Sequence, residues 1–320
     1  MDQLTSFGTS IAQSVGPTIE LYKKLLQSNE KAIKSTLRKS FAFGTNPRHN
    51  LDVYYPSSHP TGANCPVFMF VYGGGLSHGN RISPDGLLYA NIGHFFAEKC
   101  GYVVVIPDYR LVPEARFPSG GEDIAMALEW LIANHAKLGS DEGVRSLFMM
   151  GNSAGAVHLS TFLLRQEFAH IHDKISGKGT GCPLRLKAAI LCSMPAHFQN
   201  ADPSRNQTIN TYYETAVEQK CPLGLLKACK QENKINEVAF GAKVLVLTAS
   251  LDPEDEILSP SEDFVTYWRS NRVDSASSLA VQTMDGHNHI SPTSSLGTGY
   301  SAEEVWGFQV AKFCNTAARS

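Results

Sequence analysis

Short apolar runs alternate with helical patterns through most of the chain. Six of these runs are candidate strands, at residues 67–72, 102–106, 147–150, 188–191, 244–247 and 279–283. Runs that are apolar on both faces and are separated by helices are typical of a parallel sheet covered on both sides. The pattern therefore predicts an α/β fold with a mainly parallel central sheet and helices on both faces.

Helical patterns fill the stretches between and around the runs. The clearest covers residues 121–134, where apolar residues recur every three or four positions, and the last covers residues 302–314. A third pattern, at residues 17–26, can gather five apolar side chains on one helix face. These five are Ile19, Leu21, Tyr22, Leu25 and Leu26.

We expect one α/β domain over residues 1–320. Residues 1–39 form an N-terminal helical cap in this interpretation, and two short strands at 40–43 and 51–55 follow, separated by a turn-rich segment. Residues 197–239 interrupt the strand pattern with prolines, a glycine and two helical patterns. A long excursion of this kind in a sheet protein is a candidate lid insertion.

Composition and charge narrow the classes of partner. The chain is 42% apolar and 18% charged, and its 28 basic and 30 acidic side chains leave a net charge of −2, which gives no reason to expect nucleic acid. The chain does not begin with a basic segment followed by an apolar core, as a secretory signal would. No apolar run approaches the length of a membrane span. We expect a cytoplasmic protein with a small-molecule substrate and no membrane partner, and the sequence leaves a homodimer open.

The seven cysteines add little chemistry. They are an odd number and contain no C-x-x-C pair, which disfavours both a disulfide framework and a thiolate zinc site. The histidines show no H-E-x-x-H spacing, and the chain has no G-x-x-x-x-G-K-[ST] motif, so a zinc hydrolase and a nucleotide-binding protein are both disfavoured. We expect no metal and no cofactor.

The strongest chemical signal follows the apolar run at 147–150. Residues 151–155 are Gly-Asn-Ser-Ala-Gly and lead into a helical pattern. A nucleophilic serine needs a sharp turn from strand to helix, and the flanking glycines remove side chains that would clash there. The following helix also directs its free amides at developing negative charge. This context predicts Ser153 as a nucleophile.

A second glycine motif lies upstream, where the run at 67–72 breaks into three consecutive glycines. A backbone without side chains can point its amides into a cavity. We therefore predict an oxyanion hole built from the N–H groups of Gly74, Gly75 and Ala154. A flexible turn is the alternative for the glycines alone, but the two motifs together favour an enzyme.

These motifs carry a family resemblance. Tyr72-Gly73-Gly74-Gly75 resembles the His-Gly-Gly-Gly motif of the hormone-sensitive-lipase-like esterases. The segment before the nucleophile is also similar, with Asp108-Tyr109-Arg110-Leu111, Pro113-Glu114, Phe117-Pro118, Asp123 and Trp130. The resemblance implies an α/β-hydrolase fold and a triad in the chain order Ser, acid, His. One departure is Tyr72, which stands where the family motif has its His. The chain also resembles kynurenine-formamidase-like enzymes and small hydrolases of fungal biosynthetic pathways.

The resemblance places the acid after a late strand. Asp252 is the first carboxylate after the run at 244–247, and Glu254 and Asp255 compete with it. An acid at this position would hold the tautomer of the catalytic imidazole and stabilise the imidazolium.

The base is expected in the loop after the last strand. Two histidines, His287 and His289, lie within three residues there, and an ordinary imidazole pKa near 6.5 suits either as a general base. Matching to the family favours His289.

Several other residues are assigned more weakly. We expect an apolar pocket suited to a hydrophobic acyl or alcohol group, lined by Tyr72, Leu76, Asn152, Phe198 and Tyr212. His158 follows the nucleophile on a helix and is expected to be a packing residue. His78 and His94 flank the glycine loop, where surface or structural roles are expected.

The leading hypothesis is a carboxylesterase or thioesterase that uses Ser153, His289 and Asp252 on a small-to-medium hydrophobic ester, in keeping with secondary metabolism. An acyl-transfer, cyclisation or condensation enzyme could use the same residues, and so could an amidase of the kynurenine-formamidase type. A catalytically silent binding protein on the same scaffold is the alternative from another class.

Overall fold

The computed structural model of the protein describes residues 2–58, 65–139, 143–178, 181–231, 239, 241–271 and 279–319. Within them one sheet of eight strands has the order β1-β2-β4-β3-β5-β6-β7-β8. The strands are β1 Leu37–Ala42, β2 Asn50–Tyr55, β3 Val67–Val71, β4 Val103–Pro107, β5 Arg145–Asn152, β6 Leu184–Cys192, β7 Lys243–Leu251 and β8 Leu279–Asn288. Only the β1–β2 and β2–β4 pairs are antiparallel, so the predicted mainly parallel sheet is confirmed.

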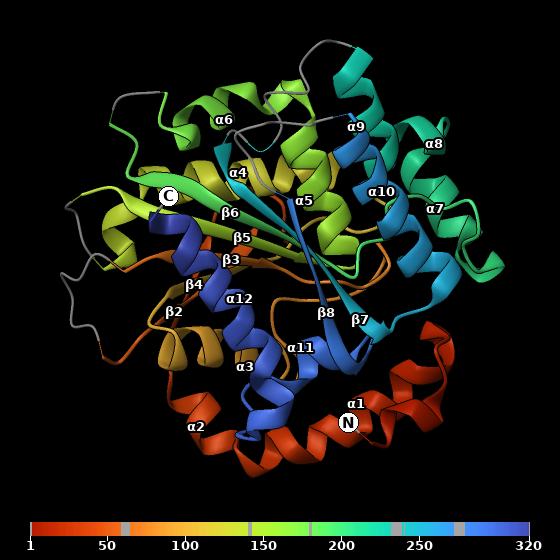
Figure 1. The fold of residues 1–320 in the computed structure, drawn as a ribbon. Coiled ribbons are helices and arrows are strands. Elements are labelled where there is room, and N and C mark those ends of the chain that lie inside the picture. Colours follow the sequence, from red (N-terminus) through yellow and green to blue (C-terminus); the bar gives the residue numbers. More distant parts are fainter. Residues whose placement is uncertain are drawn as a thin grey trace.

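The central strands are buried because helices cover both faces of the sheet. Every residue of β3 and β4 is buried. Figure 1 shows α4, α5 and α6 over one face and α3 and α12 over the other. Their bounds are α3 Ala90–His94, α4 Ser119–Ala133, α5 Ala154–Leu164, α6 Ala169–Ser176 and α12 Ser301–Arg319. Near-continuous apolar strands buried on both sides are what a parallel sheet requires.

The last strand extends beyond its predicted end at residue 283. β8 reaches Asn288 and pairs with β7, with an irregularity in the register between Ala249 and Leu251. The extension contains Asp285, Gly286 and His287, which break the apolar pattern that defined the strand in the sequence. The consequence is that His287 lies within β8, whereas His289 is the first residue after it. Helix α11, Ser291–Ser295, follows directly.

The N-terminal helix is longer than predicted, and of the predicted apolar face only Tyr22 and Leu26 are buried. α1 covers Ile11–Ser28 with Pro17 inside it, and its buried residues are Ser14, Thr18, Tyr22 and Leu26. Ile19, predicted on the apolar face, is 39% exposed. The buried row follows a spacing of four residues but begins with two hydroxyl residues, which a purely hydrophobic pattern does not detect. α1 packs along α11 at the lower edge of the molecule in Figure 1.

The predicted lid segment forms a group of short helices in its described part, and residues 232–238 lie outside the described residues. Its elements are η5 Pro203–Arg205, α7 Asn206–Tyr213, α8 Val217–Lys220 and α9 Pro222–Gln231. Ile209, Tyr212 and Tyr213 pack in one small cluster with Leu76 and Ala154. The segment is therefore anchored directly on the glycine loop and on the first residue of α5. The other helices are α2 Glu30–Ser35 and α10 Ser259–Ser270.

Candidate active site

The chain turns sharply at Ser153, between the end of β5 and the start of α5. Ser153 has φ 52° and ψ −120°, an uncommon conformation for a residue with a side chain. The turn brings the backbone at Gly155 so close to the end of β3 that a Cβ there would lie 2.1 Å from the carbonyl oxygen of Val71. Gly155 is thus required by close approach, and the turn presents the Ser153 hydroxyl at the end of the sheet.

His289 connects Ser153 to Asp252. Its Nε2 lies 2.9 Å from Ser153 Oγ, and its Nδ1 lies 2.7 Å from Asp252 Oδ1. The second carboxylate oxygen of Asp252 accepts hydrogen bonds from Ser193 Oγ and from the amide of Ala249, each at 2.7 Å. All three predicted residues are buried, and Asp252 is held from two sides. The geometry gives a serine hydroxyl, an imidazole and an oriented carboxylate in series.

The residues considered as alternatives to His289 and Asp252 lie outside this hydrogen-bonded series. His287 is hydrogen-bonded through Nδ1 to Ser291 Oγ at 2.9 Å and is 3% exposed. Burial lowers the pKa of His287 to about 4, although the charge of Glu303 acts in the opposite direction and raises it. Glu254 and Asp255 belong to η7, Glu254–Leu258, a one-turn π-helix whose Glu254 accepts a hydrogen bond from Ser259. None of these three is hydrogen-bonded to the Ser153–His289–Asp252 series.

The glycine loop lies beside Ser153. Gly74 has φ 134°, and a Cβ there would lie 2.0 Å from the carbonyl oxygen of His78, so only glycine fits. Among the described residues, no hydrogen bond uses the N–H groups of Gly74, Gly75 or Ala154. The three amides predicted for the oxyanion hole are therefore available to a ligand.

Tyr72 does not line the cavity, which corrects its assignment as a pocket residue. Its side chain is fully buried beneath the loop, where its hydroxyl donates to Asp108 Oδ1 at 2.6 Å and accepts from Arg48 Nη2 at 2.9 Å. Arg81 binds the same carboxylate through its backbone amide and its guanidinium. Tyr109 adds a hydroxyl that donates to the carbonyl oxygens of Tyr72 and Gly73 at 3.0 and 3.2 Å. Tyr72 thus supports the glycine loop through hydrogen bonds to the charged side chains of Asp108 and Arg48.

A cavity of about 480 Å³ opens over Ser153 and His289. Of the predicted pocket residues, Leu76, Asn152 and Phe198 line it, whereas Tyr212 does not. Tyr212 is 1% exposed and packs against His158, whose pKa burial lowers to about 3. Large aromatic residues next to a site are easily assigned to it, but Tyr212 instead fills the space between the lid segment and the body. His158 is a packing residue.

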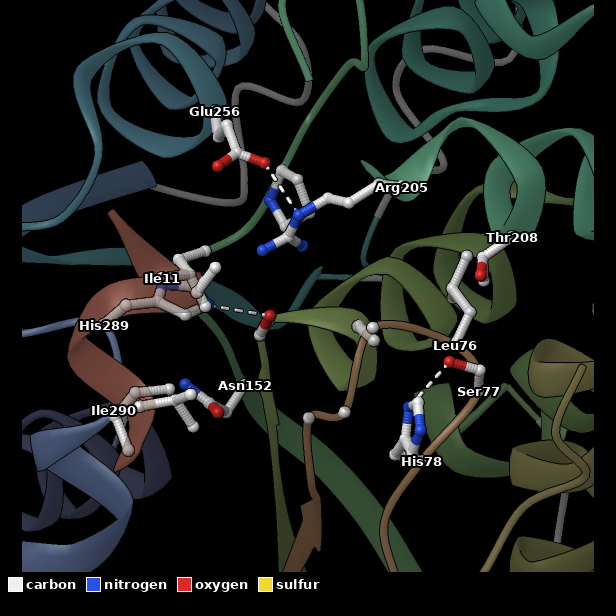
Figure 2. Close-up of a pocket in the computed structure, with 18 of the residues that line it drawn as sticks. Ile11, Leu76, Ser77, His78, Asn152, Arg205, Thr208, Glu256, His289 and Ile290 are labelled. Atoms are coloured by element: carbon white, nitrogen blue, oxygen red, sulfur yellow. Dashed lines mark hydrogen bonds and ion pairs between the residues drawn. The ribbon is translucent and has the colours of Figure 1, made fainter. Parts of the chain in front are cut away.

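Several residues that line the cavity were not predicted individually as pocket residues, although a helical cap was expected at the N-terminus. Ile11, Ala12, Val15 and Ile19 bring α1 to the rim, and Arg205 and Glu256 contribute charge (Figure 2). His78 lines the cavity, while His94 is buried elsewhere against Thr36. No motif marks these residues, because they reach the cavity from separate helices. Only the amphipathic pattern at the N-terminus could have indicated α1.

Neither a metal site nor a membrane span is evident in the part of the chain that the structure describes. No group of three or more histidine, cysteine, aspartate or glutamate side chains there is arranged to hold a metal ion. None of the described helices combines the length and apolar character needed to cross a membrane.

Comparisons with known proteins place this arrangement in a family. Esterase LipC of Mycobacterium tuberculosis (strain ATCC 25618 / H37Rv) is 35% identical over 123 residues, 38% of this chain and 28% of LipC. Gibberellin receptor GID1 of Oryza sativa subsp. japonica is 26% identical over 156 residues, 48% of this chain and 40% of the receptor. The chain thus spans less than half the length of these relatives.

The solved structures support the fold. EstE1, described as a thermostable carboxylesterase cloned from a metagenomic library, superposes with a TM-score of 0.63 at 19% identity, covering 96% of this chain and 99% of EstE1. A family model described as BD-FAE matches residues 51–238. Because that match covers more than half of the chain, the protein belongs to the BD-FAE family of α/β-hydrolases, alongside the hormone-sensitive-lipase-like esterases that its motifs resemble.

Proposed function

We propose that the protein is a carboxylesterase that hydrolyses a small-to-medium hydrophobic ester through Ser153, His289 and Asp252. The observation that carries the proposal is the 2.9 Å contact between Ser153 Oγ and His289 Nε2, with Asp252 bonded to the opposite nitrogen of the ring. A serine hydroxyl becomes nucleophilic when a neighbouring base can take its proton during attack. The esterases among the relatives support the same activity.

The first half-reaction forms an acyl-enzyme. His289 Nε2 takes the Ser153 proton as Oγ bonds to the carbonyl carbon, and the amides of Gly74, Gly75 and Ala154 hydrogen-bond the resulting oxyanion. Asp252 keeps Nδ1 protonated and stabilises the imidazolium. The carbon–oxygen bond to the alcohol then breaks, and His289 returns its proton to the departing alcohol.

Water completes the cycle. His289 takes a proton from a water molecule as its oxygen bonds to the acyl carbon, and the bond to Ser153 Oγ breaks as the imidazolium reprotonates that oxygen. The cavity lining supports a hydrophobic substrate, since its apolar residues include Leu76, Phe198 and Ile209 together with Ile11 and Val15 of α1. A cavity of about 480 Å³ suits a substrate of moderate size.

Fluorophosphonate labelling tests the nucleophile. Wild-type protein should be labelled and Ser153→Ala should not, while both give the same circular dichroism spectrum. A folded wild type that stays unlabelled and hydrolyses no p-nitrophenyl ester from acetate to decanoate would contradict the proposal. That result would favour a binding protein on this scaffold, a function that the relative described as a gibberellin receptor illustrates. An added alcohol that captures most of the acyl group in place of water would favour acyl transfer.

A further inference from the structure

One charged pair interrupts the apolar wall of the cavity. Arg205, the last residue of η5, pairs through Nε with Glu256 Oε2 at 2.9 Å, and the two side chains are 29% and 15% exposed. Glu256 Oε2 also accepts the backbone N–H of Asp202. Figure 2 shows the Arg205 guanidinium projecting into the cavity, with Glu256 on one side and His289 on the other. The pair therefore faces the space in which a substrate would lie.

The terminal nitrogens of Arg205 make no hydrogen bond within the described part of the protein. Its contact with Glu256 is closest through Nε, and Nη1 and Nη2 are both good donors. Other partly buried arginines engage these nitrogens fully or in part. Arg81 bonds Asp108 through Nη1, and Arg110 bonds Glu122 through Nη2. Arg205 thus keeps donors available in the cavity next to the reacting groups.

The surrounding charge decides which acceptor these donors favour. Among the described residues that line the cavity, the acidic and basic side chains other than histidine are Arg205, Glu256 and Asp202, one cation and two carboxylates. Glu256 already neutralises the guanidinium, so a substrate carboxylate would gain hydrogen bonds but would also meet two like charges. An uncharged carbonyl oxygen gains the hydrogen bonds without that repulsion.

We propose that Arg205 donates its Nη hydrogens to a second, uncharged carbonyl oxygen of the substrate, and so selects oxygenated esters over plain hydrocarbon esters. The inference rests on the proposed esterase function and names the substrate class of the same cavity. A purely hydrocarbon group would displace water from the guanidinium without replacing its hydrogen bonds. Sites that hydrogen-bond a substrate group reject analogues that lack it.

Three esters of similar length test the proposal: p-nitrophenyl hexanoate, p-nitrophenyl 5-oxohexanoate and mono-p-nitrophenyl glutarate. The 5-oxo ester should exceed hexanoate in kcat/KM by about tenfold to a hundredfold in wild type, the range for one hydrogen bond to a charged group. The same comparison is run with hexyl acetate and 5-oxohexyl acetate, so that a carbonyl on the alcohol side is also tested. In Arg205→Met the preference should fall to near one.

Two variants separate donation to substrate from a structural role of the pair. Glu256→Gln breaks the ion pair but leaves the Arg205 donors, so it should keep the 5-oxo preference and raise kcat/KM for the glutarate ester relative to hexanoate. Arg116→Met removes an exposed ion pair with Glu214, at the far end of α7, and should leave the ratios as in wild type.

Several results would overturn the inference. These are a wild-type ratio near one in both ester series, a ratio unchanged in Arg205→Met, or a ratio that Glu256→Gln abolishes as completely as Arg205→Met. Preference of the wild type for the glutarate ester over the 5-oxo ester would contradict an uncharged acceptor. Hydrolysis of simple esters with any of these results rejects the inference and keeps the esterase. Absence of both hydrolysis and fluorophosphonate labelling rejects both.

Discussion

Two buried histidine–aspartate pairs in the described part of the protein look alike in isolation. His289 lies 2.7 Å from Asp252, and His49 lies 3.0 Å from Asp123. The difference is in the second ring nitrogen. In His289 it meets the Ser153 hydroxyl at the floor of a cavity, whereas in His49 it has no partner among the described residues and lies against Gly44.

The carboxylates differ as well. Asp252 is bonded by neutral donors, Ser193 and the amide of Ala249, and keeps its charge for the imidazole. Asp123 is shared with Arg110, which reaches it through Nε at 2.8 Å and through its backbone amide at 2.7 Å. A histidine–carboxylate contact therefore does not define a site. In the site that we propose, a serine hydroxyl contacts the second ring nitrogen, and no arginine shares the carboxylate.

Removing the two imidazoles in turn should change catalysis and stability in opposite proportions. His289→Ala should lower kcat for a p-nitrophenyl ester by at least about 10⁴-fold, because the base for Ser153 is lost. His49→Ala should leave kcat within about twofold and instead lower the free energy of unfolding by about 1–3 kcal/mol, measured in urea. A comparable loss of kcat in a folded His49→Ala protein would remove the distinction between the pairs.

Substitution of the two carboxylates should likewise affect catalysis in one case and stability in the other. Asp252→Asn should reduce kcat by about 10³- to 10⁴-fold, since an amide neither fixes the Nδ1–H tautomer nor stabilises the imidazolium. Asp123→Asn should cost about 1–3 kcal/mol of stability, because the buried carboxylate that Arg110 and His49 share is lost, with little change in kcat. Steady-state kinetics and urea unfolding on both variants check the pair of outcomes. Equal stability losses with equal kinetics would contradict it.

The sequence predicted what local chain geometry determines. Ser153 and the glycine loop are specified by motifs whose residues are adjacent, and the ends of two predicted strands brought Asp252 and His289 into consideration. Residues that act across the fold carry no such mark. The side-chain amide of Asn288, next to His289, donates to Thr18 Oγ1 of α1 at 2.8 Å, across 270 positions of the chain. Arg205, Glu256 and Ser193 reach the site from separate elements, and Tyr72 and Tyr212 were assigned wrongly because sequence position does not show which way a side chain points.

A third buried histidine, His287, should make the stability of the protein depend on pH. Burial lowers the pKa of His287 to about 4, so the folded protein keeps the ring neutral while the unfolded chain takes up a proton below about pH 6.5. The stability linked to this group is complete above pH 6.5 and is lost as the pH falls toward 4. Between pH 7.5 and pH 5 the loss should be about 2 kcal/mol. His287→Gln should flatten the stability profile in that window, as measured by urea unfolding, and an unchanged slope would contradict the assignment.

The smallest effect concerns the loop opposite the imidazole. Tyr109 donates its hydroxyl to the carbonyl oxygens of Tyr72 and Gly73, and a peptide carbonyl points away from the N–H of the same unit. Holding the Gly73 carbonyl therefore orients the Gly74 amide that we assign to the oxyanion hole. Tyr109→Phe should lower kcat by about three- to tenfold with little change in KM, because the amide matters most in the transition state.

Tyr213→Phe is the matched control, since Tyr213 is equally buried but its hydroxyl has no hydrogen-bond partner among the described residues. It should leave kcat unchanged. If both phenylalanine variants lower kcat alike, or if Tyr109→Phe raises KM alone, the hydroxyl acts through general packing or ground-state binding. A fall in kcat for Tyr109→Phe alone would show that this loop resembles the two histidine pairs. In both cases a buried polar contact affects catalysis only when it orients a group toward the cavity.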